Sequence, residues 1–271
     1  MAVKSHQGHK GALRGFCGEG IVRLTVVLTT AFLCLASQAN AQSPEERAGA
    51  RALITKHGNA VMFVLGTTKI RINQGGKEAP PTDQRIQALV TIIDGSGLGV
   101  MSLTALDPSD VLTATLSRGR GASAGVSVTT EPAELRYRLP DGKEVPVRVV
   151  LRDKDLDLAF LRPVEKPATP MAAIDAAPSR PQAIDAVVVL QRLPELASWQ
   201  PTALFYSVQA VLEKPRLFYL LTGGLVGAPV FDTKGGFLGV IVRLRNEADA
   251  SNVTPIVLPA NDIREVAKQA N

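Results

Sequence analysis

The sequence predicts an all-β protein built from two small barrels. From residue 85 onward, short runs of β-branched and other apolar residues alternate with turn residues, which is the pattern of an all-β chain. A stretch rich in proline and alanine, residues 163–181, divides these runs into two groups of six. Six strands suit one small barrel, and the roughly 230 residues after position 41 are enough to form a hydrophobic core.

Residues 1–41 have the composition of a secretory signal peptide. Basic residues precede an apolar run at 24–36, and small residues ending at Ala41 would allow cleavage before Gln42. The run is too short to be a good transmembrane span. We therefore expect an exported protein, periplasmic or secreted, without a stable membrane span after cleavage. The alternative is a signal segment that is kept as an anchor.

Removal of this segment changes the charge and the cysteine content. Lys plus Arg falls from 30 to 26 and Asp plus Glu from 25 to 24, so the net charge falls from +5 to +2. No dense basic patch remains, which argues against a nucleic-acid partner. Both cysteines, Cys17 and Cys34, leave with the segment, so the mature chain is expected to have no disulfide and no cysteine metal site.

The predicted N-terminal segment, 42–84, contains a helix, a strand and a loop. Ser43 and the following Pro-Glu-Glu form a capping-box pattern with proline at the first helical position, and the helix is expected to end near Gly58. An apolar strand follows at 60–65. Two glycines and two prolines at 74–82 predict a mobile surface loop.

The first barrel is predicted over 85–165 and is followed by a linker, 166–185. Its turns are expected at Pro108-Ser109-Asp110, in the Gly/Ser/Ala-rich stretch 119–127, and at Pro140-Asp141-Gly142. Its candidate strands are 86–93, 98–103, 111–114, 134–138, 145–152 and 158–161.

The second barrel is predicted over 186–271 and ends with a helix. Asn261 or Asp262 is expected to cap this helix, in which apolar residues recur on one face. The candidate strands are 186–190, 203–211, 217–221, 228–232, 237–243 and 255–258.

Residues 222–232, TGGLVGAPVFD, resemble the active-site loop of trypsin-like serine proteases of the HtrA type. In that family the loop has the sequence Gly-Asn-Ser-Gly-Gly-Pro, which aligns with residues 224–229 of this chain. The glycine and the proline are kept, but Val226 stands where the nucleophilic serine is expected. Other motifs of the family resemble segments of the mature chain in the same order, and this resemblance implies a double β-barrel of trypsin type. It does not extend to the PDZ module that commonly follows in this family.

The catalytic histidine is also missing from the resemblance. Gly95-Ser96-Gly97 is similar to the family's entry into the first barrel, and 110–113 is similar to a segment that ends at an Asn-His pair. The histidine position then falls on Leu116 or a neighbour, and no histidine occurs after His57. The nearby hydroxyls of Thr115, Ser117 and Thr222 would each lack a base.

The acid of the triad is better preserved. Residues 153–161 resemble the family's Asp-x-x-x-Asp-Leu-Ala segment, which places Asp157 on the triad acid. The alternative is an ordinary carboxylate at the start of a strand that accepts backbone amides, and without an imidazole this alternative is favoured.

Two backbone amides are a further candidate site. The resemblance implies that the oxyanion donors are the amides of Gly224 and Val226, which a side-chain change leaves in place if the loop keeps its shape. Leu225 and Ala228 depart from the family at neighbouring positions. The hypothesis is that the loop still holds a peptide carbonyl or a carboxylate.

His57 and the acidic residues offer no metal site in the sequence. His57 lies at the end of the first predicted helix, where a cation interacts favourably with the helix dipole. Asp153, Asp155 and Asp157 alternate but lack the glycine and the bidentate acid of a calcium loop. We expect no cofactor and no metal.

The leading function is a non-catalytic binding or regulatory protein of the cell envelope whose partner is an unidentified protein or peptide. One alternative is a serine-type hydrolase with a displaced nucleophile. Another is a structural component of the envelope.

Overall fold

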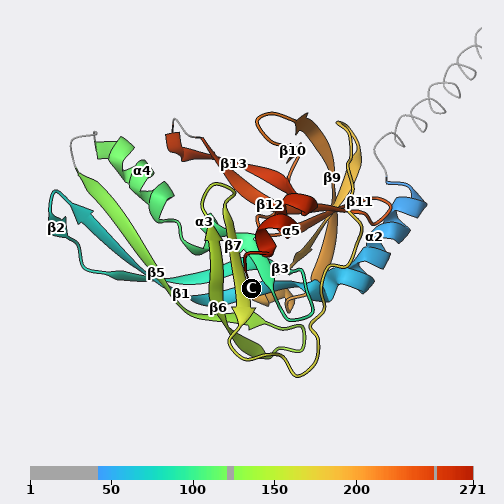
Figure 1. Ribbon diagram of the computed structural model, residues 1–271, viewed down its shortest axis with the longest axis horizontal. Helices are drawn as coiled ribbons and strands as arrows, with labels where there is room; N and C mark the ends of the chain where they lie inside the picture. Colours follow the sequence, from blue (N-terminus) through green and yellow to red (C-terminus); the bar gives the residue numbers. More distant parts are fainter. Residues whose placement is uncertain (1–41, 121–124, 247–248, 271) are drawn as a thin grey trace, which may run out of the picture. The chain divides into compact units, whose positions relative to one another are not determined.

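Two closed β-barrels follow one another along the chain in the computed structural model of this protein (Figure 1). The structure describes residues 42–120, 125–246 and 249–270. The predicted signal segment, 1–41, lies outside the described residues, as do Cys17 and Cys34. Residues from Glu45 onward form one unit, and the description below applies to that unit. In the described part of the chain no helix is long and apolar enough to cross a membrane.

The first barrel closes through the strand order β1-β3-β4-β7-β6-β5, with β5 returning to β1, and all its pairings are antiparallel. The short strand β2 extends the sheet beyond β1. These strands are β1 (Val61–Gln74), β2 (Lys77–Glu78), β3 (Thr82–Ile92), β4 (Gly99–Ser102), β5 (Val126–Arg138), β6 (Glu144–Asp153) and β7 (Leu158–Pro163).

The barrel begins earlier than the boundary at residue 85 that the sequence predicts. β1 pairs with β3 from Val61 opposite Thr91 to Ile70 opposite Thr82, so the N-terminal segment supplies one of the six strands. The predicted loop 74–82 shrinks to a tight turn with Gly75 and Gly76 at positive φ, followed by β2. The β-branched residues Thr67, Thr68, Ile70 and Ile72 before the glycines favour the extended conformation of β1 up to the turn.

The predicted strand 111–114 is wrong, because these residues lie in a helix, α4 (Ser109–Arg120), which follows the short helix α3 (Leu103–Leu106). The predicted turn at 108–110 starts this helix. Asp107 accepts hydrogen bonds from the amide and hydroxyl of Ser109, and Pro108 follows it, which is a helix-start pattern.

The second barrel closes as β10-β13-β12-β11-β8-β9. It contains six strands as predicted, although several extend further than the sequence indicates. They are β8 (Ala186–Arg192), β9 (Pro201–Leu212), β10 (Phe218–Leu221), β11 (Pro229–Asp232), β12 (Phe237–Asn246) and β13 (Asp249–Pro259), and the short 3-10 helix η3 (Glu195–Ala197) joins the first two.

One further helix precedes the first barrel in the chain and another follows the second barrel. α2 (Pro44–His57) is followed by a 3-10 turn, η1 (Gly58–Ala60), and then directly by β1. The final helix, α5 (Ala260–Ala267), begins immediately after β13, with Pro259 at its N-cap and no side-chain cap hydrogen bond. The predicted caps Asn261 and Asp262 are therefore inside the helix.

Polar contacts join the two barrels. The hydroxyl of Thr91, on β3, donates to the carbonyl of Gly227 at 2.9 Å. The buried guanidinium of Arg192, on β8, donates to the carbonyls of Val61, Gly58 and Trp199 at 2.6–2.7 Å. Burial lowers the pKa of Arg192. Because buried donors must be satisfied, these bonds fix the start of β1 against the second barrel.

Candidate functional site

The carboxylate of Asp157 is buried between the two barrels, with 3% of the residue exposed. Its Oδ1 accepts hydrogen bonds from the amide of Thr104 at 2.7 Å and from the hydroxyl of the same residue at 2.6 Å. Its Oδ2 accepts from the hydroxyl of Ser102 and from the amide of Arg243 at 2.8 Å. Four donors therefore occupy both oxygens, and one of them comes from the second barrel.

The backbone of this residue supports the same arrangement. Asp157 has a φ of +55°, a conformation that aspartate tolerates better than most residues, and its own carbonyl accepts the amide of Leu103 at 2.8 Å. The residue thus ties the start of β7 to the junction of β4 and α3 and to β12. The predicted alternative, a carboxylate that accepts backbone amides at a strand start, describes these contacts.

Leu116, where the sequence places the histidine position, is a partly buried residue of α4. The groups that reach Asp157 from the first barrel come instead from Ser102 and Thr104, at the junction of β4 and α3. An imidazole bonded to Asp157 would therefore have to stand at that junction. Sequence reasoning missed both hydroxyl residues, for which the local pattern carries no distinguishing signal.

The loop 222–228 lies beside β12 and is held by backbone bonds. Gly227 has a φ of +89°, and its amide donates to the carbonyl of Ile241 at 2.7 Å. A Cβ atom at Gly227 would lie 2.2 Å from the carbonyl oxygen of Leu89, so glycine is required where the loop meets the first barrel.

Two amides of this loop remain available. Neither the amide of Gly224 nor that of Val226 donates a hydrogen bond to another described residue. The side chain of Val226 is partly buried and packs against the core, whereas Leu225 is 50% exposed. Sequence reasoning singled out these two amides, and the structure gives each of them an unused donor.

β12 brings the acid and the loop together. Ile241 exchanges backbone hydrogen bonds with Gly227 and Ala228 at the end of the loop. Two residues later the amide of Arg243 donates to Asp157, and two residues after that the side chain of Arg245 meets Asp110 of α4 at 2.9 Å. Alternate residues of one strand therefore contact the loop, the acid and α4 in turn.

A cavity of about 300 Å³ lies beside the loop. Its walls come from the loop itself, from the ends of β9 and β10, and from β12 and β13. The lining includes Leu221, Gly224, Ile241, Pro255 and Val257. This mostly apolar lining and modest volume suit a single aliphatic side chain.

His57 is a buried neutral residue rather than the helix-end cation that the sequence predicts. It lies at the end of α2 but is only 2% exposed, and its ring stacks on Phe231 at 5.3 Å between centroids. Burial lowers its pKa, and the adjacent Lys56 adds to this shift, while a hydrogen bond with the backbone of Ala173 opposes it. The ring therefore serves as a packing element of the second barrel.

No base among the described residues is hydrogen-bonded to the other hydroxyls considered in the sequence. Thr115 donates to the carbonyl of Val111 within α4, and the hydroxyl of Thr222 accepts the amide of Ser207 at 3.1 Å. Ser117 lies further along α4. Within the described residues no group of three or more His, Cys, Asp or Glu could hold a metal ion.

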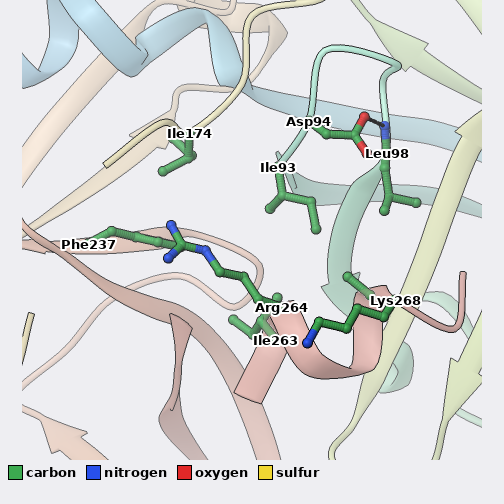
Figure 2. Close-up of a pocket in the computed structure, with 9 residues that line it drawn as sticks. Ile93, Asp94, Leu98, Ile174, Phe237, Ile263, Arg264 and Lys268 are labelled. Atoms are coloured by element: carbon green, nitrogen blue, oxygen red, sulfur yellow. Dashed lines mark hydrogen bonds between the residues drawn. The ribbon is translucent and has the colours of Figure 1, made fainter. Parts of the chain in front are cut away.

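A second cavity, of about 290 Å³, lies between α5 and the loop that follows β3 (Figure 2). Ile93, Leu98 and Ile263 contribute to its apolar wall. The side chains of Arg264 and Lys268 line it from α5, but Arg264 donates to the carbonyl of Ala176 and Lys268 pairs with Glu265. Its polar groups are engaged, and it stands apart from Asp157.

A family model described as "Trypsin-like peptidase domain" matches residues 97–240, which include the Asp157 network and the loop. The chain belongs to this family. No curated protein matches this trypsin-like chain.

Solved structures of the HtrA-type protease AlgW share the fold. The structure of an AlgW variant with a decapeptide has 14% identity and a TM-score of 0.53, and covers 81% of this chain and 65% of its own. AlgW itself with a decapeptide has 13% identity and a TM-score of 0.53, with coverage of 82% and 67%. This trypsin-like chain thus spans about two thirds of the length of those proteins, and at this identity the likeness concerns the fold alone.

Proposed function

We propose that this trypsin-like protein is exported and does not cleave peptide bonds, and that it binds an extended polypeptide beside β12 and the loop 222–228. The observation that carries the proposal is the complete engagement of Asp157 by Ser102, Thr104 and Arg243. A carboxylate bonded in this way acts as an anchor and has no imidazole to orient. The signal-like composition of residues 1–41 supports export.

Lack of catalysis also follows from the types of residue present. Serine-protease chemistry needs a hydroxyl and a base, and the position that resembles the nucleophile carries Val226. No histidine follows His57 in the sequence, and His57 itself is buried against Phe231. The lost groups are therefore not supplied from elsewhere in the mature chain.

Peptide binding is supported by three features of one surface. The amides of Gly224 and Val226 are unused donors, and the cavity beside them accepts an aliphatic side chain. β12 runs alongside both; it pairs with β13 on one side, but on the other side its pairing with β11 ends at Val240. A peptide in extended form presents carbonyls and side chains at the spacing that such a surface needs. The AlgW structures with decapeptides make a peptide a reasonable ligand to propose for this chain.

The hydrolase alternative is weakened by the burial of the available hydroxyls. Ser102 and Thr104 contact a carboxylate that could in principle act as a base, but they are 0% and 5% exposed. A substrate carbonyl cannot reach them without unfolding the junction of β4 and α3. The exposed Thr222 has no carboxylate partner.

The test of inactivity uses the mature protein with a fluorophosphonate probe and fluorescent casein. We expect no labelling and no cleavage above a buffer blank. Labelling that disappears on substitution of one named hydroxyl, such as Ser117→Ala or Thr222→Val, would contradict the proposal and support the hydrolase.

The test of binding follows backbone amide resonances during titration with extended peptides. We expect the shifts of Gly224 and Val226 to move together and to saturate. The amide of Gly235, which lies in the turn after β11, is the internal control and should not move. Saturable binding that leaves Gly224 and Val226 unchanged would place the peptide elsewhere and overturn this site.

A further inference from the structure

α4 connects the two barrels at the end of the surface described above. The helix packs against β5 of the first barrel and β13 of the second, as Figure 1 shows. It begins three residues after α3, close to the Asp157 network, and its first turn reaches the end of β12 through Asp110. A polypeptide that follows β12 past Arg243 therefore meets α4.

Two cations converge on one oxygen of Asp110. Arg245, from β12, lies 2.9 Å from Oδ2, and Lys154, from the turn between β6 and β7, lies 3.5 Å from the same atom. The cations come from different barrels, and the carboxylate comes from neither sheet. Arg245 and Lys154 thus contact one carboxylate from two sides, and in this structure that carboxylate belongs to Asp110.

The contacts of α4 differ between its two sides. On the first barrel, the hydroxyl of Thr113 accepts the amide of Val128 at 2.9 Å, and Asp107 accepts the hydroxyl of Thr130. Arg152 adds an ion pair to Asp107 at 3.3 Å. These bonds attach the start and middle of the helix to β5 and β6.

On the second barrel, α4 packs against β13, and its Asp110 forms the ion pair with Arg245, whose partners are 29% and 41% exposed. Ion pairs with this exposure are weak and are screened by salt. The carboxylate of Asp110 can therefore leave Arg245 while the helix itself stays in place against β5 and β13.

We propose that Arg245 and Lys154 bind an acidic side chain of the polypeptide ligand, and that Asp110 of α4 occupies this site until the ligand displaces it. The inference rests on the proposed function and adds to it the chemistry of the ligand: an extended peptide with Asp or Glu next to the segment that pairs with β12. α4 acts as an internal competitor, because the Asp110 carboxylate and a ligand carboxylate cannot bind the same two cations at the same time.

Hydrogen exchange tests the role of Asp110 without a ligand. In Asp110→Asn, the α4 amides 111–118 should exchange several-fold faster than in the wild type, while β8 is unchanged. Asp155→Asn is the matched control, because it removes the same charge from an exposed residue near Lys154 and should leave α4 unchanged. Equal exchange in Asp110→Asn and the wild type would overturn the proposal.

A phage-displayed library of random heptapeptides tests the ligand chemistry. The protein is presented as the full mature chain in three forms: wild type, Asp110→Asn, and the double variant Asp110→Asn with Arg245→Ala. We expect Asp110→Asn to recover the most peptides, enriched in Asp and Glu, and the double variant to lose that enrichment. A synthetic peptide from the selection should bind Asp110→Asn roughly threefold to fivefold more tightly with Glu than with Gln at low salt, and the difference should shrink in high salt.

The outcomes separate this inference from the proposed function. Peptides that move the resonances of Gly224 and Val226 but show no acidic preference would overturn the carboxylate site and leave peptide binding intact. Failure of all three forms to select any peptide would overturn both.

Discussion

The two ends of the candidate site differ in how their polar groups are bonded. At the acid end, Asp157 is 3% exposed and both its oxygens are occupied by donors from β4, α3 and β12. At the loop end, Gly224 and Val226 keep amides that donate to no other described residue, and the neighbouring Leu225 is half exposed. The acid of the candidate site is thus fully hydrogen-bonded within the protein, whereas the two amides of the loop are the donors that our proposal assigns to a ligand.

This difference follows from what each group needs to work. A carboxylate of a triad acts through an imidazole, whereas the donors bonded to Asp157 are two hydroxyls and two backbone amides. Backbone amides act through their position alone, which the glycines of the loop and the bonds of Gly227 maintain. Our proposal of binding without catalysis depends on this difference.

The largest effect should come from removing the acid. Asp157→Ala would leave the buried donors of Ser102, Thr104 and Arg243 without their acceptor, which we expect to cost about 3 to 5 kcal/mol of unfolding free energy. Urea unfolding monitored by fluorescence measures it. The exposed Asp155→Ala serves as control and should stay within about 0.5 kcal/mol of the wild type. A cost below about 1 kcal/mol for Asp157→Ala would show that the acid end is no anchor.

A smaller loss is expected when the loop is forced away from the first barrel. In Gly227→Ala, the new Cβ would lie 2.2 Å from the carbonyl oxygen of Leu89 at a φ of +89°, which should cost about 2 to 4 kcal/mol and weaken peptide binding. Gly235→Ala is the matched control. Its φ is +91°, but its nearest neighbour is Leu53 at 3.9 Å, so the clash is absent and the cost should be about 1 kcal/mol. Equal effects would mean that the contact with Leu89 is unimportant.

The pH dependence of stability should depend on protonation of His57, a residue that belongs to neither end of the site. Its pKa is lowered in the folded protein, so below about pH 6.5 the unfolded chain binds the proton first and stability falls as the pH decreases. Above that pH the ring is neutral in both states and contributes no pH dependence. His57→Phe keeps a ring against Phe231 and should flatten this part of the profile. An unchanged slope between pH 5 and 7 in His57→Phe would contradict the assignment.

The smallest effect is expected from restoring the missing hydroxyl. Val226→Ser removes a partly buried apolar side chain and should cost about 1 kcal/mol or less. It should not react with a fluorophosphonate probe, because no base accompanies the new hydroxyl. Labelling of the variant at the rate of an active protease would show that a hidden base exists and would restore the hydrolase alternative.

Sequence patterns predicted the second barrel well, because its strands are short, apolar and separated by clear turns. They also predicted the loop 222–232 as the feature that links the chain to its family. They placed Asp157 at a strand start. These features are local, so a local pattern is enough to find them.

The errors arose where tertiary contacts decide the structure. The run at 111–114 is β-branched and apolar, yet Asp107 and Pro108 start a helix that covers it. The partners of Asp157 and the pair Asp110 and Arg245 lie 53 to 135 residues apart in the chain, and no periodicity joins them. The histidine position was assigned to Leu116 from the alignment of a short motif, whereas the hydroxyls that are bonded to Asp157 come from a different segment.

Through Thr91 and Arg192, each barrel holds a backbone segment that belongs to the other barrel or leads into it. The carbonyl of Gly227 is held by Thr91, and the entry to β1 is held by Arg192, so each barrel completes a part of the other. We therefore expect the two fragments left by a single cut in the linker 166–185 to elute as one complex in size-exclusion chromatography under native conditions. The loop 222–228 depends on both barrels for its conformation, because Gly227 is bonded to Thr91 of the first and to Ile241 of the second.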